Sequence, residues 1–156
     1  MMPLRYSPWR DLASRPHLHL LVAPTGDPDV WGYFEPDTST VTIDSGCDQV
    51  ERRCTLAHEL AHVDRGDEAH HTADYPEAER QTVRDEAAAD DLAARRLIPL
   101  DRLADALMPD DDLWRAAADL DVDHPMLCAR LRGLTDEEHA AVWADLNERE
   151  AGLPWA

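Results

Sequence analysis

The chain is poor in basic residues: 15 Lys and Arg stand against 33 Asp and Glu in 156 residues, for a formal net charge of −18. Nucleic acids and anionic membrane surfaces are polyanions, and a field of this sign repels both. The composition therefore argues against nucleic acid or a membrane as the main partner. It suits solubility and would attract a basic protein substrate.

Cysteines and long apolar runs are also scarce. The three cysteines, Cys47, Cys54 and Cys128, are an odd number without zinc-knuckle spacing, so we expect reduced thiols instead of a disulfide framework. No apolar stretch approaches the roughly 20 residues of a transmembrane helix, and the N-terminal residues lack the apolar core of a signal peptide. We therefore expect a cytoplasmic protein that acts on a restricted set of substrates.

The most informative motif is H-E-x-x-H, formed by His58, Glu59 and His62. Residues four apart on a helix lie on one face, so both imidazoles can point at one metal ion. Glu59 lies beside them, placed to take a proton from a metal-bound water. The same letters also describe a helix with two surface histidines, so the motif needs support from downstream residues.

A catalytic zinc needs a third protein ligand and an open position for water. Glu86, 24 residues after His62, lies in an Ala-rich segment of helical periodicity that ends before Pro99. Asp90, one turn further, is placed to accept the other ring N–H of His58 or His62. Glu-x-x-x-Asp on a second helix resembles gluzincin metallopeptidases such as thermolysin. The alternative is a solvated acidic helix face.

Other residues compete for the role of third ligand. His70 and His71 do not fit the metzincin spacing, because Arg65 and Glu68 occupy the positions where that pattern has Gly and His. Asp85 points about 100° away from its neighbour around the helix, so only one of the two can face the metal. Three carboxylates in the polar connection are expected to be solvated: Asp64, Asp67 and Asp74.

Three segments carry a likeness to a known family: Arg52–His62, the Glu86 and Asp90 pair, and the Leu97-Ile98-Pro99 ending. Together they resemble the ImmA/IrrE metallo-endopeptidases. Residues 30–34 and 40–44 resemble the hairpin that leads into that family's zinc helix. The likeness covers roughly residues 16–100 and is nearest to the short versions encoded by phages and mobile elements. Two positions depart from the family pattern, Ala88 in place of a second Glu and Leu92 in place of a Phe.

This resemblance implies a cytosolic zinc endopeptidase that cleaves one protein substrate, a phage or mobile-element repressor. In it, His58, His62 and Glu86 hold Zn²⁺ and Glu59 is the general base, although ligand type alone also allows manganese. An alternative is a catalytically silent protein that relieves repression by binding the repressor. The residues leave the oxyanion donor open among four candidates: Tyr33, Tyr75, His70 and His71.

The periodicity predicts an α+β fold in which a small antiparallel sheet packs on the H-E-x-x-H helix pair. We expect strands over 17–22, 30–35 and 40–44, and helices over 9–13, 47–65, 77–98 and 100–107. The tail is predicted to form helices over 112–120, 126–134 and 136–150, the first two with a helix-turn-helix rhythm. Because the second of these carries only Arg130 and Arg132 as basic residues, we expect a structural or partner-binding role. The predicted domains are 1–108, the metallopeptidase domain, and 109–156, the helical unit.

Overall fold

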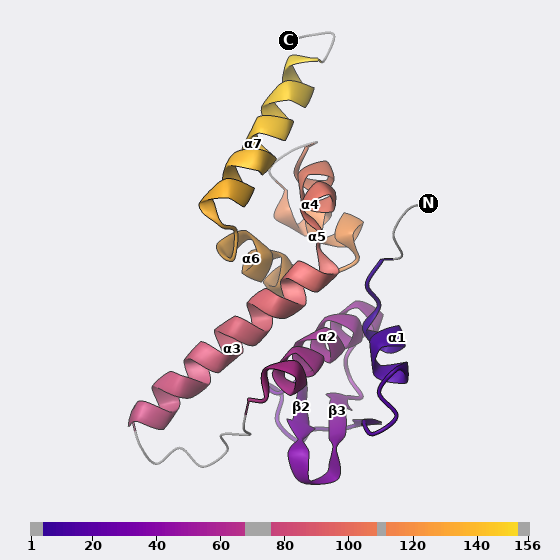
Figure 1. The fold of residues 1–156 in the computed structure, drawn as a ribbon. Helices are drawn as coiled ribbons and strands as arrows, with labels where there is room; N and C mark the ends of the chain where they lie inside the picture. The colour runs from indigo at the N-terminus through magenta and orange to yellow at the C-terminus, as the bar shows by residue number, and fades with distance from the viewer. Residues whose placement is uncertain (1–4, 68–75, 109–111, 153–156) are drawn as a thin grey trace.

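The computed structural model of the protein describes residues 5–67, 76–108 and 112–152 (Figure 1). Its elements are α1 (Pro8–Ala13), β1 (His19–Ala23), β2 (Gly32–Glu35), η1 (Pro36–Thr38), β3 (Thr40–Asp44), α2 (Gln49–Arg65), α3 (Pro76–Leu97), α4 (Leu100–Leu107), α5 (Leu113–Leu120), α6 (His124–Arg132) and α7 (Asp136–Ala151). The predicted α+β class is confirmed. No helix within the described ranges is long and apolar enough to cross a membrane.

The three strands form one sheet in the order β1-β3-β2. β2 and β3 pair in antiparallel fashion as predicted, but β1 runs parallel to β3, from His19 opposite Thr40 to Ala23 opposite Asp44. The sheet is therefore mixed, and the wholly antiparallel sheet predicted from the sequence is corrected. β1 is one edge strand of the sheet and β2 is the other. The β2–β3 hairpin turns the chain back, so β3 lies between the two edge strands and runs in the same direction as β1. Alternating residues identify strands but do not fix this order.

Helix α2 has clear sequence signals at both ends. Asp48 caps its first turn and forms a capping box with Glu51, while Gly66 ends it in the left-handed conformation at a φ of 69°. One face of α2 packs on the sheet through Leu56 and Leu60, which are buried with strand residues Val41 and Ile43 among others. Because His58 and His62 lie on the opposite face of the helix, the sheet side of α2 is structural and the far side is free for a site.

The other side of α2 packs against α3 through small side chains. Ala57 and Ala61 of α2 and Ala89 and Ala93 of α3 are fully buried in one cluster. Small residues let two helix backbones approach closely, which brings the carboxylates of α3 over the histidines of α2. Figure 1 shows α3 as the long helix that runs from this contact to the C-terminal helices.

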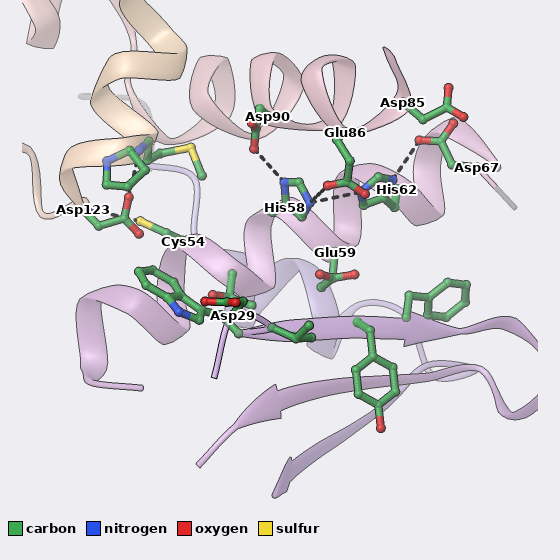
Figure 2. A pocket seen from close by; sticks show the side chains of 18 of the residues that line it. Asp29, Cys54, His58, Glu59, His62, Asp67, Asp85, Glu86, Asp90 and Asp123 are labelled. Atoms are coloured by element: carbon green, nitrogen blue, oxygen red, sulfur yellow. Dashed lines mark hydrogen bonds and ion pairs between the residues drawn. The ribbon is translucent and has the colours of Figure 1, made fainter. Parts of the chain in front are cut away.

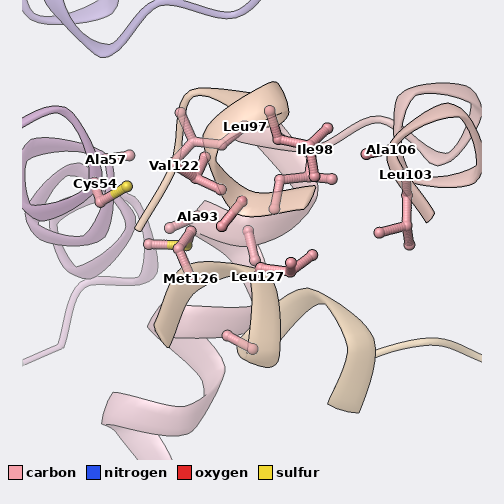
Figure 3. Close-up of a cluster of buried hydrophobic side chains, with 14 of the residues drawn as sticks. Cys54, Ala57, Ala93, Leu97, Ile98, Leu103, Ala106, Val122, Met126 and Leu127 are labelled. Atoms are coloured by element: carbon pink, nitrogen blue, oxygen red, sulfur yellow. The ribbon is translucent and has the colours of Figure 1, made fainter. Parts of the chain in front are cut away.

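The same cluster continues into the C-terminal helices (Figure 3). It includes Ile98 after α3, Leu103 of α4, Leu127 of α6 and Val142 of α7. The parts before and after residue 108 therefore share buried contacts, and their division into two domains stays a prediction.

A charged network fixes α6 and α7 against the end of α3. Arg130 is 3% exposed and donates to the carbonyl oxygen of Ile98 at 3.0 Å and to Glu138 at 2.9 Å. Arg95 of α3 also donates to Glu138, at 2.8 Å. The bonds from Arg130 and from the Thr135 N–H lower the pKa of Glu138 to about 2. Arg130, one of the two basic residues noted on this helix, is thus used for packing.

We predict that Glu138→Gln lowers the free energy of unfolding at pH 7 by about 2 kcal/mol, because it leaves a buried guanidinium without its anion. Since the pKa of Glu138 is depressed in the fold, this stabilisation is present above the unfolded value near 4.3 and is lost as pH falls toward about 2. Denaturant unfolding of both proteins across this range measures the effect. Glu137→Gln, an exposed neighbour on the same turn, is the control, and equal losses in both variants would contradict the prediction.

Candidate metal centre

The candidate site lies where α2 and α3 face each other (Figure 2). His58 and His62 are one turn apart on α2, and Glu86 and Asp90 are one turn apart on α3. Each helix thus presents two side chains to the other because residues four apart share a face. The structure brings together all of the residues that the sequence nominated for metal binding.

The atoms that would bind a metal converge. The Nε2 atoms of His58 and His62 lie 3.0 Å apart, and the Glu86 carboxylate lies 3.1 Å from His58 Nε2 and 3.3 Å from His62 Nε2. A tetrahedral zinc ion with bonds of about 2.0–2.1 Å places neighbouring ligand atoms about 3.3 Å apart. The donor set and its spacing therefore fit one zinc-sized ion with three protein ligands.

The second nitrogen of each imidazole faces a different carboxylate. His58 Nδ1 lies 2.9 Å from Asp90, which settles the choice that the sequence left open between His58 and His62. His62 Nδ1 lies 2.9 Å from Asp67. If each Nδ1–H donates to its carboxylate, each Nε2 keeps its lone pair for a metal.

Asp67 is the residue that sequence reasoning missed, because it was expected to be solvated. A signal for it was present: Gly66 ends α2 in the left-handed conformation, which folds the next residue back over the last turn. Accordingly the Asp67 backbone N–H donates to the carbonyl oxygen of His62 at 3.2 Å.

The other rivals for the metal lie elsewhere or are bound by other groups. Asp64 accepts hydrogen bonds from Arg15 and Arg96, and Asp85 accepts them from Gln81 and Arg65. Further candidates for ligand or oxyanion donor lie outside the described residues: His70, His71, Asp74 and Tyr75. Tyr33, the remaining oxyanion candidate, pairs with Thr42, whereas its neighbour Phe34 packs in the cluster under α2. Tyr33 is among the residues that line the cavity. Because side chains alternate along a strand, its side chain nevertheless belongs to the face of the sheet away from α2.

Glu59 lies between α2 and β2, below the histidines (Figure 2). It is only 6% exposed, and this burial raises its pKa although the two histidines and a hydrogen bond with the backbone of Phe34 oppose the shift. A carboxylate with a raised pKa is a stronger base than one in water. The predicted general base is therefore in a position to exchange protons at the site.

The electrostatics of the ligand set favour a cation. Burial opposes protonation of His58, but its bonds to Asp90 and Glu86 outweigh burial and raise its pKa to about 10. The same contacts with His58 and His62 lower the pKa of Glu86. Positive charge is stabilised between these groups, as a metal site requires.

A cavity of about 490 Å³ opens over the cluster. One wall is formed by Trp31, Gly32 and Phe34 at the start of the hairpin, and another by Pro125 and Met126 of α6. All three candidate ligands and Glu59 also line it. A substrate in this cavity would reach both the ligand cluster and the candidate base.

An H-E-x-x-H helix with a carboxylate from a second helix under an open cavity defines a metallopeptidase type of centre. The family model of the IrrE N-terminal-like domain, a family of metallopeptidases, matches residues 13–132, and the chain belongs to this family. The resemblance drawn from the motifs is thereby confirmed, and the match extends beyond it into α6. A comparison with curated proteins found no match.

We predict that the purified protein holds about one divalent ion per chain and that Glu86→Ala holds clearly less, because two ligands retain a zinc-sized ion poorly. Elemental analysis of both proteins after the same gel filtration measures this. Asp91→Ala removes a carboxylate of the same helix that does not line the cavity, so it should bind as the native protein does. Equal metal in native protein and Glu86→Ala would rule out Glu86 as a ligand.

We predict that Gly32→Ala damages both the fold and the site. A Cβ at this position would lie 2.5 Å from Thr55 Cγ2 and 2.8 Å from the Thr42 carbonyl oxygen, so β2 must move away from α2 and Glu59. Overpacking of this kind costs about 1–3 kcal/mol of unfolding free energy. Denaturant unfolding measures the loss, with Gly152→Ala as a control because its added Cβ makes only ordinary contacts. Native stability of Gly32→Ala would show that the strand adjusts freely.

Proposed function

We propose that the protein is a zinc-dependent endopeptidase that cleaves a specific protein substrate in the cytoplasm. The observation that carries this proposal is the convergence of His58, His62 and Glu86 on one point, with the buried carboxylate of Glu59 beside it. A metal-storage or structural site has no use for a carboxylate that lies beside the ligands without binding the metal, and closed structural zinc sites take four protein ligands.

In this mechanism His58, His62 and Glu86 would hold the metal. Zinc bound there supplies a Lewis acid for the scissile carbonyl and a water of lowered pKa. Glu59 accepts the proton of the attacking water and then returns it to the leaving amine as the C–N bond breaks. Its raised pKa suits both steps, because a carboxylic acid that is too strong would not give the proton back. Asp90 holds the ring of His58 in the orientation that binds metal.

The hairpin supports cleavage within a chain. Among the described strands, β2 pairs only with β3, so its other edge has no neighbouring strand beside the cavity, although the backbone of Phe34 is hydrogen-bonded to Glu59. An extended peptide can add to such an edge as a further strand, with its backbone held on both sides of the scissile bond. Binding of this kind does not need a free chain end, which favours an endopeptidase.

The finer parts of the proposal rest on the family resemblance and on charge. A phage or mobile-element repressor is the proposed substrate, and a net charge of −18 would favour a basic surface on it. Nucleic acid is not a proposed partner, because the chain is strongly acidic and Arg130 is buried in the network with Glu138. An interaction protein that binds the repressor without cutting it is the alternative function.

We predict that Glu59→Gln reduces peptide cleavage by at least about a hundredfold while metal content is kept, because the change removes the base and no ligand. The probe is a proteome-derived peptide library, in which mass spectrometry identifies new internal cleavage sites. Native protein treated with a chelator is the second inactive sample. Cleavage by native protein alone supports the endopeptidase. If native protein holds zinc yet cuts nothing, or Glu59→Gln cuts equally well, the proposal fails and the binding function leads.

A further inference from the structure

The two candidate zinc histidines have carboxylate partners in unlike environments. Asp90 is one turn from Glu86 on α3, and its side chain is 42% exposed. Asp67 follows the C-terminal Gly of α2, and its side chain is only 10% exposed. Both lie 2.9 Å from an imidazole Nδ1. Because a hydrogen bond shielded from water is electrostatically stronger than an exposed one, these two contacts differ in strength despite equal lengths.

Asp67 is also held more firmly than Asp90. The oxygen that faces His62, Oδ2, accepts a second hydrogen bond from Arg65 Nε at 2.7 Å. Arg65 in turn reaches Asp85 of α3 at 3.3 Å, and Gln81 donates to the same Asp85 oxygen at 2.9 Å. We call this series of contacts, from His62 through Asp67 and Arg65 to Asp85, the Asp67 relay. It ties the end of α2 to the helix that carries Glu86.

We propose that Asp67 is the main positioning residue of the metal site, and that it sets the ring orientation of His62 through the Asp67 relay. The inference rests on the proposed function, because it concerns the same metal. A neutral imidazole binds metal through Nε2 only when its proton is on Nδ1 and its ring plane is fixed. The Asp67 carboxylate provides both conditions for His62, and the hydrogen bond from Arg65 holds that carboxylate in place.

Asp67 thus ranks above Asp90 as a positioning residue, an order that the family motif alone would not give. The Glu86 and Asp90 pair carries the resemblance to gluzincins, so the motif favours Asp90 as the principal outer carboxylate. Burial and the second bond to Arg65 favour Asp67 instead. Loss of Asp67 should therefore weaken metal binding more than loss of Asp90 does.

The test is the zinc dissociation constant, measured on the full chain by competition with a chromophoric chelator. Asp67→Ala should weaken zinc binding by about 10–100-fold, the range typical of groups that orient metal ligands, and Asp90→Ala by less. Asp64→Ala is the matched control: it removes a carboxylate from the same end of α2 whose partners are Arg15 and Arg96. It should bind zinc within about twofold of the native protein.

Two further measurements separate positioning from general damage to the fold. Arg65→Gln should weaken zinc binding less than Asp67→Ala and should add little to it in the double variant, because both act through one relay. The visible absorption spectrum of the Co²⁺-loaded protein should change in Asp67→Ala, be partly restored in Asp67→Asn, and stay native in Asp64→Ala. A side chain that only stabilises the fold would leave this spectrum unchanged.

The outcomes are distinct. Native zinc affinity and a native cobalt spectrum in Asp67→Ala would overturn the inference and leave the proposed function intact. A larger loss in Asp90→Ala than in Asp67→Ala would overturn the ranking of the two carboxylates. If the native protein itself binds neither zinc nor cobalt, the proposed function fails, and this inference fails with it.

Discussion

The close contact between α2 and α3 is the constraint on which the candidate site depends. The two histidines belong to α2 and Glu86 belongs to α3. The Glu86 carboxylate lies 3.1 Å from His58 Nε2 and 3.3 Å from His62 Nε2, so the helices cannot separate without breaking these contacts. The alanines that line the contact set this approach, because a larger side chain at Ala57 or Ala93 would push the backbones apart by more than these distances tolerate. The packing of α2 against α3 thus fixes the distances between the candidate ligand atoms.

The C-terminal helices contribute to this constraint from the other end of α3. Leu127 and Val142 belong to the cluster that buries Ala57 and Ala93, and the network of Arg130 with Glu138 anchors α6 and α7 to the carbonyl of Ile98. Met126 then forms part of the cavity wall. The α5–α6 pair has the predicted helix-turn-helix rhythm, but its second helix faces α3 with its buried residues, so its place in this fold is to support and shape the site.

The convergence of the candidate ligands was predictable because helical geometry is local. The spacing of His58 and His62, and that of Glu86 and Asp90, decides which side chains share a face, whatever the tertiary structure. The carboxylate partner of each imidazole depends instead on how α3 crosses α2 and on the turn after Gly66. The periodicity of the sequence predicts neither of these. The parallel pairing of β1 with β3 was unpredictable for the same reason, because strand order follows from the path of the connections.

The charges of the site explain why so acidic a cluster can be built at all. Most of its carboxylates have a partner: Asp90 faces His58, and Asp67 faces both His62 and Arg65. Glu86 contacts both His58 and His62. The exception is Glu59, whose pKa is raised by its burial and, to a lesser degree, by repulsion from Glu86. A divalent cation near both carboxylates would turn that repulsion into attraction and would stabilise the folded state by binding it. The arrangement that raises the pKa of Glu59 is thus also one that would favour a bound metal.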